Sequence, residues 1–149
     1  MLPNNKKYKQ GYYKLKNPDK YQGDIYNVIY RSSWELKVFK WIDTNDSIIS
    51  WSAEEIKIGY ISPIDSKMHT YYPDILAKTR TKSGKIVTYL IEIKPEAQTK
   101  EPKTKQRVTK KYINEVYTWG INSAKWKAAK RYCEQRGWVF KLLTEKEIF

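Results

Sequence analysis

The stretch from Tyr71 to Pro95 constrains the fold most, because it has the composition of two β-strands joined by a short turn. Residues 71–80 and 86–94 are both rich in β-branched and aromatic residues, which favour strands. The polar segment between them contains Gly84, and glycine adopts the left-handed conformation of a tight turn without steric cost. The sequence therefore predicts a β-hairpin.

The length of the turn decides which residues of the two strands face one another. A three-residue loop over 82–84 places Asp74 opposite Glu92, whereas a two-residue loop would place Asp74 opposite Ile93, on the other face. We favour the three-residue loop. Because strand side chains alternate between faces, Glu92 and Lys94 share one face, and this register adds Asp74 to it. The same register pairs Ile75 with Ile91 and Leu76 with Leu90.

Two carboxylates that face each other across a hairpin repel, and this repulsion needs an explanation. A cation bound between Asp74 and Glu92 would remove it. The register therefore points to a metal site at the end of the hairpin where Pro95 ends the second strand.

A helix is predicted to begin at Ser32 or Ser33 and to end near residue 43, with Glu35 in its first turn. Ser32 and Glu35 have the spacing of a capping box, in which each side chain binds a backbone amide of the helix start. Glu35 also shares a face with the apolar residues four and seven positions further on. A carboxylate on such a face needs a partner, and a metal ion would be one. Both interpretations of Glu35 stay open.

The remaining elements follow from periodicity and from turn residues. We expect an irregular basic arm over about 1–27, a strand over 51–60, a turn over 61–67, a short helix over about 107–119, a long helix over 124–136 capped by Ser123 and stopped by Gly137, a strand over 138–143 and a last helical turn from Thr144. At 149 residues, the chain is expected to form a single domain over 1–149.

The charge of the chain points to a polyanionic partner. Lysine and arginine number 29 against 16 acidic residues, a net charge of +13, and aromatic residues make up 15%. Packing does not explain such an excess, and nucleic acid is the first candidate. The excess is strongest in the segment 94–111, for which a merely solvated face is the alternative. Its candidate DNA-binding residues are Lys100, Lys103, Lys105, Arg107, Lys110 and Lys111.

The arm is also rich in lysine and tyrosine, a combination suited to phosphate contact and base stacking. Its tyrosines could equally pack on the domain as cover, and the sequence does not separate these roles. The single cysteine, Cys133, excludes an intrachain disulfide framework and is expected to be a small buried residue. His69, the only histidine, is expected at the surface. No apolar run is long enough to cross a bilayer, and the N-terminus lacks the apolar region of a signal peptide.

Pro73-Asp74, followed by Glu92-x-Lys94, resembles the motif of the PD-(D/E)XK nucleases. The order helix, three strands, helix, strand is similar to the core of their restriction-endonuclease-like fold. The resemblance therefore implies an α/β (α+β) fold with a central mixed sheet flanked by helices. In that core, Glu35 occupies the helix position from which many members supply a further acid.

Residues 17–24, 30–35, 72–74 and 91–95 make the chain similar to the TnsA-like endonucleases, and to the head-completion nucleases of T-even bacteriophages among them. One departure is Glu92, where TnsA-type sites often carry glutamine. The resemblance implies DNA as partner, with phage head, neck or portal proteins as further candidates, and a location in the virion or the host cytoplasm. It does not imply an oligomeric state.

The residues themselves indicate how such a site would work. Asp74 and Glu92 are hard oxygen ligands suited to Mg²⁺, for which Mn²⁺ would substitute, and the backbone carbonyl of Ile93 could add a ligand. Lys94 would deprotonate the attacking water or stabilise negative charge. Glu35 would bind the metal directly or through water. These assignments make the chain a metal-dependent DNA endonuclease.

Two other functions are compatible with the same sequence. One is a structural DNA-binding protein of head completion without catalysis, although the intact set of Asp74, Glu92 and Lys94 argues against it. The other is a ribonuclease, since basic and aromatic side chains serve either polymer.

Overall fold

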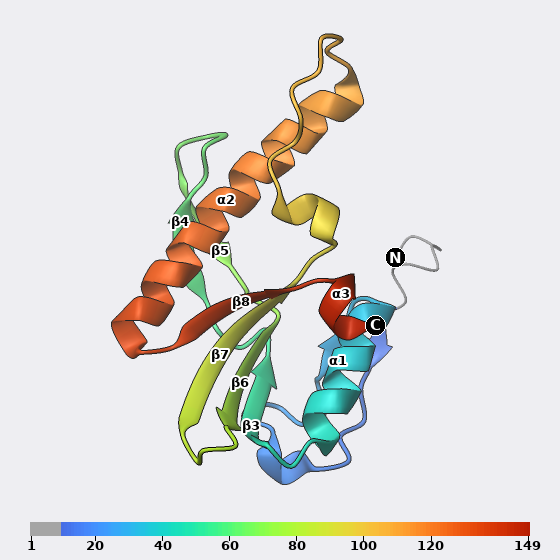
Figure 1. Ribbon diagram of the computed structural model, residues 1–149, viewed down its shortest axis with the longest axis vertical. Coiled ribbons are helices and arrows are strands. Elements are labelled where there is room, and N and C mark those ends of the chain that lie inside the picture. Colours follow the sequence, from blue (N-terminus) through green and yellow to red (C-terminus); the bar gives the residue numbers. More distant parts are fainter. Residues whose placement is uncertain (1–9) are drawn as a thin grey trace.

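The computed structural model describes residues 10–149, and its centre is a four-stranded sheet in the order β3-β6-β7-β8 (Figure 1). The four strands are β3 (Ile48–Ala53), β6 (Ile75–Arg80), β7 (Ile86–Ile93) and β8 (Val139–Leu143). Strands β3, β6 and β7 are antiparallel to one another in turn, whereas β8 runs parallel to β7. The expected mixed sheet is confirmed.

The predicted register of the central hairpin is correct. Ile75 pairs with Ile91 and Leu76 with Leu90. The three-residue loop is closed by two backbone hydrogen bonds, in which Thr81 N–H donates to Lys85 and Gly84 N–H to Thr81. Gly84 has a φ of 86°, so the left-handed residue lies where the turn requires it.

The predicted strand over 51–60 is wrong as one element. Its first part belongs to β3 in the central sheet, and its second part is β4 (Ile58–Ile61), which pairs with β5 (Met68–Tyr71) in a separate two-stranded sheet. Between them the chain turns at Glu54, whose φ of 56° is left-handed. The β4-β5 hairpin is thus an insertion, and the core order helix, three strands, helix, strand holds without it.

The two predicted C-terminal helices are one helix, α2 (Lys110–Arg136), which is 27 residues long. Thr109 caps its start and Gly137, with a φ of 70°, ends it, but Ser123 is an interior residue and no cap. Gly120 did not interrupt it, because a glycine inside a helix costs only about 1 kcal/mol relative to alanine. A Cβ on Gly120 would lie 3.6 Å from Pro63 of the β4-β5 turn, an ordinary contact distance, so the packing there does not require a glycine.

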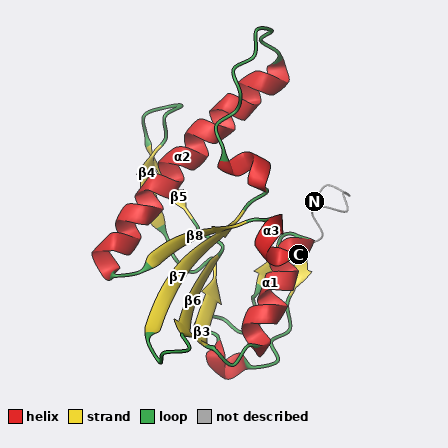
Figure 2. Ribbon diagram, in the orientation of Figure 1, coloured by secondary structure: helices red, strands yellow, loops and turns green. Residues whose placement is uncertain are grey.

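The two main helices cover opposite faces of the sheet (Figures 1 and 2). Helix α1 (Ser33–Thr44) packs on the face that presents Ile75, Ala77 and Ile91. Helix α2 packs on the face that presents Leu90, with Trp126, Ala129 and Cys133 in its buried stripe. The remaining elements are β1 (Gly11–Tyr12), β2 (Ile29–Tyr30), the 3₁₀ helices η2 (Pro18–Lys20) and η3 (Glu96–Thr99), and α3 (Glu145–Ile148).

Several smaller expectations are confirmed. Cys133 is buried and free, and His69 is exposed, where it pairs with Asp65. Thr144 and Glu147 form a capping box at the start of α3. None of the helices within residues 10–149 is long and apolar enough to span a membrane.

The segment 10–27 is largely irregular, as the sequence predicted, with only β1 and η2 as regular elements, but it packs on the domain. Tyr13 and Tyr21 are buried against Trp51, with ring centroids 6.5 and 4.9 Å away. Of the two roles considered for the tyrosines, these two therefore serve as cover for the domain. The more basic part of the arm, 1–9, lies outside the described residues.

A single buried carboxylate, Asp43, fastens this segment to the domain. Asp43 accepts hydrogen bonds from the Tyr13 hydroxyl at 2.7 Å and from the backbone amides of Lys16 and Asn17 at 2.8 and 3.2 Å. Asp43 is fully buried, and a buried carboxylate is tolerated where such donors surround it.

Replacing Asp43 by alanine leaves those donors without a partner. We expect Asp43→Ala to lower the free energy of unfolding by about 3–5 kcal/mol, the scale for breaking a buried charged network. Urea denaturation measures this change. The control is Asp46→Ala, because Asp46 is exposed and carries the same charge. A loss for Asp43→Ala no larger than the control's would contradict the assigned role.

Candidate active site

The hairpin brings Asp74 to the end of the sheet, where the ladder between β6 and β7 stops. The last paired residues are Ile75 and Ile91, and the side chain of Asp74 then takes over as a hydrogen-bond acceptor. Its Oδ2 accepts the backbone N–H of Ile93 at 2.7 Å. Pro73, directly before it, is fully buried and fixes the chain as it enters the strand. The carboxylate is therefore held at the end of the strand pair.

Glu35 reaches the same place from the first turn of α1, and both interpretations of its role have support. Ser32 caps the helix by accepting the N–H of Glu35 at 3.1 Å. The Glu35 carboxylate bends back and accepts the N–H of Arg31 at 2.6 Å, one residue before the position that a capping box uses. The same carboxyl group also forms a hydrogen bond with Asp74. Glu35 thus orders the helix start and belongs to the acidic site.

A third acid, Glu54, completes this cluster, and the sequence analysis missed it. Carboxylate oxygens of Glu35, Glu54 and Asp74 all lie within 4.8 Å of one another. Arg31 binds Glu54 through two hydrogen bonds, of 2.8 and 3.0 Å. Glu54 is also the residue at which the chain leaves β3 with a left-handed φ, and such backbone strain is frequent at functional sites.

Burial, together with repulsion between neighbouring carboxylates, raises the pKa values of acids at this site. Burial, followed by the charge of Asp74, raises the pKa of Glu35 to about 8. Burial also raises the pKa of Asp74 to about 6, although the amide of Ile93 and the charge of Lys94 oppose the increase. A divalent cation that took up these negative charges would release the protons.

Glu92 lies apart from the three acids, on the side of the sheet that α2 covers. Its carboxylate accepts a hydrogen bond from the hydroxyl of Tyr71, and it is not a member of the cluster. Burial raises the pKa of Glu92 to about 7, against the opposing charges of Lys94 and Lys125. The prediction that Asp74 and Glu92 face each other as a pair is wrong, because Asp74 lies with Glu35 and Glu54 instead.

Two lysines stand beside Glu92. Lys94 follows β7, and its backbone N–H donates to Leu143 of β8 at 2.9 Å, which extends the parallel ladder past the strand end. Lys125 comes from α2, with its ammonium 5.5 Å from the ring centre of Tyr71 and 5.8 Å from that of Tyr60. Burial, and then the charge of Lys94, lowers the pKa of Lys125.

The basic segment after Lys94 projects beside this end of the sheet. It begins with η3 and continues as a loop that leads into the first turns of α2, which extends beyond the body of the domain (Figure 1). The candidate DNA-binding residues Lys100, Lys103, Lys105, Arg107, Lys110 and Lys111 are all exposed. Lys100, Lys110 and Lys111 line a groove of about 690 Å³ between η3, the loop and α2.

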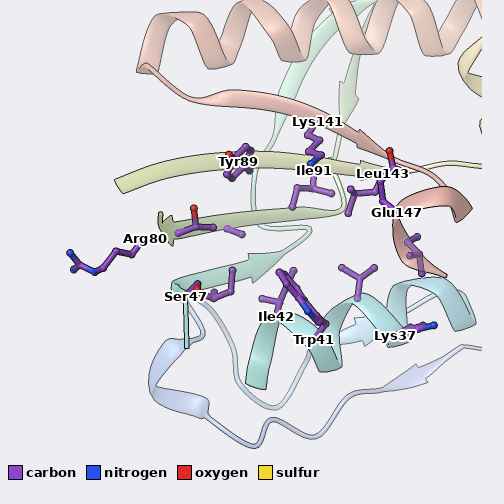
Figure 3. A pocket seen from close by; sticks show the side chains of 15 residues that line it. Lys37, Trp41, Ile42, Ser47, Arg80, Tyr89, Ile91, Lys141, Leu143 and Glu147 are labelled. Carbon is purple, nitrogen blue, oxygen red and sulfur yellow. The ribbon is translucent and has the colours of Figure 1, made fainter. Parts of the chain in front are cut away.

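An apolar cavity of about 470 Å³ lies elsewhere, between α1, the sheet and α3 (Figure 3). Ile42, Ile91 and Leu143 are among its walls, and Lys37 and Lys141 lie at its edge. Neither the acidic cluster nor Glu92 and Lys94 line it. The cavity is therefore not part of the acidic site.

The donor set near Asp74 fits a hard divalent cation. Carboxylate oxygens are the ligands that Mg²⁺ and Mn²⁺ prefer, and three of them converge here. Glu35 and Asp74, which the sequence analysis assigned to one site, lie together in the structure. The sequence analysis missed Glu54 because the position of this residue depends on where β3 ends. It placed Lys125 on the predicted helix 124–136 without a role, because the neighbours of Lys125 depend on how that helix packs on the sheet.

Two comparisons with known proteins agree with this geometry. The family model of the TnsA-like endonuclease N-terminal domain matches residues 45–145. The chain is also similar to the head completion nuclease of enterobacteria phage T4, with 41% identity over 134 residues that make up 87% of each chain. The match spans β3 to β8 and so includes Asp74, Glu92 and Lys94. The chain belongs to the TnsA-like endonuclease family.

Proposed function

We propose that this endonuclease hydrolyses DNA with a divalent metal ion, Mg²⁺ or Mn²⁺ in its place, at the end of the central hairpin. The observation that carries the proposal is the convergence of three acids, Glu35, Glu54 and Asp74, beside Lys94. A bound divalent cation would orient the attacking water and withdraw charge from the phosphate. The residues suited to hold it are Asp74, Glu35 and Glu54, with Glu92 and the carbonyl of Ile93 as further ligands.

The remaining side chains have distinct tasks in this proposal. The amide of Ile93 orients Asp74, and carboxylate oxygens of Glu35 and Glu54 lie within 4.8 Å of an Asp74 oxygen. Lys94, whose charge acts on both Asp74 and Glu92, accepts the proton of the water or stabilises the negative charge of the phosphate. Tyr71 fixes Glu92 through its hydroxyl.

The exposed lysines and arginine of 100–111 supply the DNA-binding surface. Contacts from such residues to phosphates give affinity without reading sequence. Similarity to a head completion nuclease supports a role in finishing phage heads, with DNA and head, neck or portal proteins as partners. Purified protein incubated with supercoiled plasmid and with structured RNA, in Mg²⁺, Mn²⁺ or EDTA, tests the polymer and the metal together. Cleavage of RNA alone, or cleavage that survives EDTA, would contradict the proposal.

The first prediction concerns the carboxylates of the hairpin. We expect Asp74→Asn and Glu92→Gln each to lower the cleavage rate to below about one hundredth of the wild-type rate, because each removes an anionic oxygen that would hold the divalent cation. Both variants should melt at or slightly above the wild-type temperature without metal, since a raised carboxyl pKa marks a charge that destabilises the fold. The control is Asp46→Asn, and wild-type cleavage by either site variant would refute the assignment.

The second prediction uses the raised pKa of Glu35. The folded protein holds this proton up to about pH 8, whereas an unfolded glutamate loses it near 4.5. Over that range the folded state binds more protons, so the free energy of unfolding of the metal-free protein must fall as pH rises, by about 1.4 kcal/mol for each pKa unit. In Glu35→Gln this part of the fall should disappear.

Urea denaturation in EDTA at several pH values measures the difference between Glu35→Gln and wild type. Glu134→Gln, at an exposed position of α2, is the control and should keep the wild-type slope. A ligand role for Glu35 also requires loss of metal-dependent cleavage in Glu35→Gln. Normal cleavage with a lower melting temperature would leave Glu35 with its helix-start role alone.

The third prediction concerns the basic loop. Each phosphate contact contributes about 0.9 to the slope of log affinity against log salt on duplex DNA. Replacing Lys103, Lys105 and Arg107 together by glutamine should therefore flatten that slope by about two to three, with little change in sequence preference. The matched control replaces Lys78, Lys82 and Lys85, which are exposed near the hairpin turn, at the other end of the sheet. An unchanged slope in the loop variant would exclude this surface.

A further inference from the structure

Lys125 occupies a position on α2 where a lysine is unexpected. The buried stripe of the helix contains Asn122, Trp126, Ala129 and Cys133, and Lys125 lies three residues after Asn122 and four before Ala129, on the same side. Lys127 and Lys130, on the same helix, are exposed, whereas Lys125 is partly buried. Burying part of a lysine costs free energy, so its position needs a specific reason.

The surroundings of Lys125 orient its ammonium toward the end of the sheet where the acids lie. The ammonium lies near the rings of Tyr71 and Tyr60, and Tyr71 in turn donates its hydroxyl to Glu92. Contacts with aromatic faces hold a lysine stem in place without neutralising its charge. Helix α2 thus delivers a fixed positive charge beside Glu92 and Lys94.

Neither Lys94 nor Lys125 forms an ion pair with a carboxylate within 4.0 Å anywhere in residues 10–149. Each is close enough for its charge to act on the other and on Glu92. Two neighbouring cations repel, and an anion bound by both would offset this repulsion. A phosphate group of the DNA backbone is such an anion, and its oxygens accept hydrogen bonds from several ammonium groups at once.

We propose that Lys125 is a second catalytic lysine, which binds a non-bridging oxygen of the phosphate being cleaved. Hydrolysis forms a bond from the water oxygen to phosphorus and breaks the bond from phosphorus to the leaving oxygen. The water gives up one proton to a base, and the leaving oxygen takes up one. In between, negative charge increases on the non-bridging oxygens, where a preorganised ammonium lowers the barrier. This inference rests on the proposed nuclease site.

The decisive variant is Lys125→Met, which keeps an unbranched apolar stem against the two tyrosines and removes the charge. We expect the first-order rate of plasmid cleavage, with enzyme in excess and Mg²⁺ present, to fall by about 100-fold, the scale for one charge-stabilising donor. DNA affinity measured in EDTA should change by less than about threefold, because one contact among many is lost. Lys125→Arg keeps the charge and should stay within about tenfold of wild type.

The control is Lys127→Met, two residues further on, which makes the same change at an exposed position and should cleave at the wild-type rate. A rate for Lys125→Met within about threefold of wild type would overturn the inference. So would a Lys125→Arg variant as slow as Lys125→Met but with the wild-type melting temperature. A purely structural Lys125 would lower the melting temperature and leave the rate of the folded enzyme unchanged, which also overturns it. If wild type and Lys127→Met both fail to cleave, the proposed function itself is wrong.

Discussion

The acidic site depends on one hydrogen bond, from the backbone amide of Ile93 to the carboxylate of Asp74. This bond replaces a backbone hydrogen bond between β6 and β7 at the point where the two strands stop pairing. The acidic site therefore lies directly at the end of the sheet. It also opposes the rise in pKa that burial gives Asp74. Because the amide belongs to β7, any shift in hairpin register would separate Asp74 from Glu35. The precision of the site therefore comes from strand pairing.

This end of the molecule holds groups of like charge close together, carboxyl groups in one place and ammonium groups in another. Three carboxyl groups converge on the side of α1, and two ammonium groups stand beside Glu92 on the side of α2. Each group is disfavoured without a ligand of opposite charge. A divalent cation and a phosphate are ligands of the two required signs, and a phosphodiester bound together with a metal ion supplies both.

Helix α2 connects the basic loop to the end of the sheet where the acids lie. Its first turns extend beyond the body of the domain next to the basic loop, and its middle contributes Lys125 beside Glu92. A continuous helix is stiff, so residues several turns apart keep a fixed spacing. With two separate helices, the position of the basic loop would not be fixed relative to that of Lys125.

The sequence by itself determined the parts of this protein that depend on local chemistry. The turn residues around Gly84 fixed the register of the hairpin, which pairs Ile75 with Ile91 and Leu76 with Leu90. Ser32 predicted the start of α1, and Gly137 the end of α2. These features follow from backbone sterics and from period-two or period-3.6 patterns, which operate over a few residues.

The tertiary structure decided whatever depends on residues distant in sequence. It split the predicted strand over 51–60 at Glu54, because the two parts pair with different strands, and so brought a third acid to the site. It buried Tyr13, which donates to Asp43, and Tyr21 in the core, a choice that the sequence had left open. It joined the two predicted helices across Gly120, because one weak helix former costs only about 1 kcal/mol and the second half of α2 packs on the sheet. The residues that a strand, a tyrosine or a lysine contacts depend on the free energy of the whole fold. A short stretch of sequence does not determine that free energy.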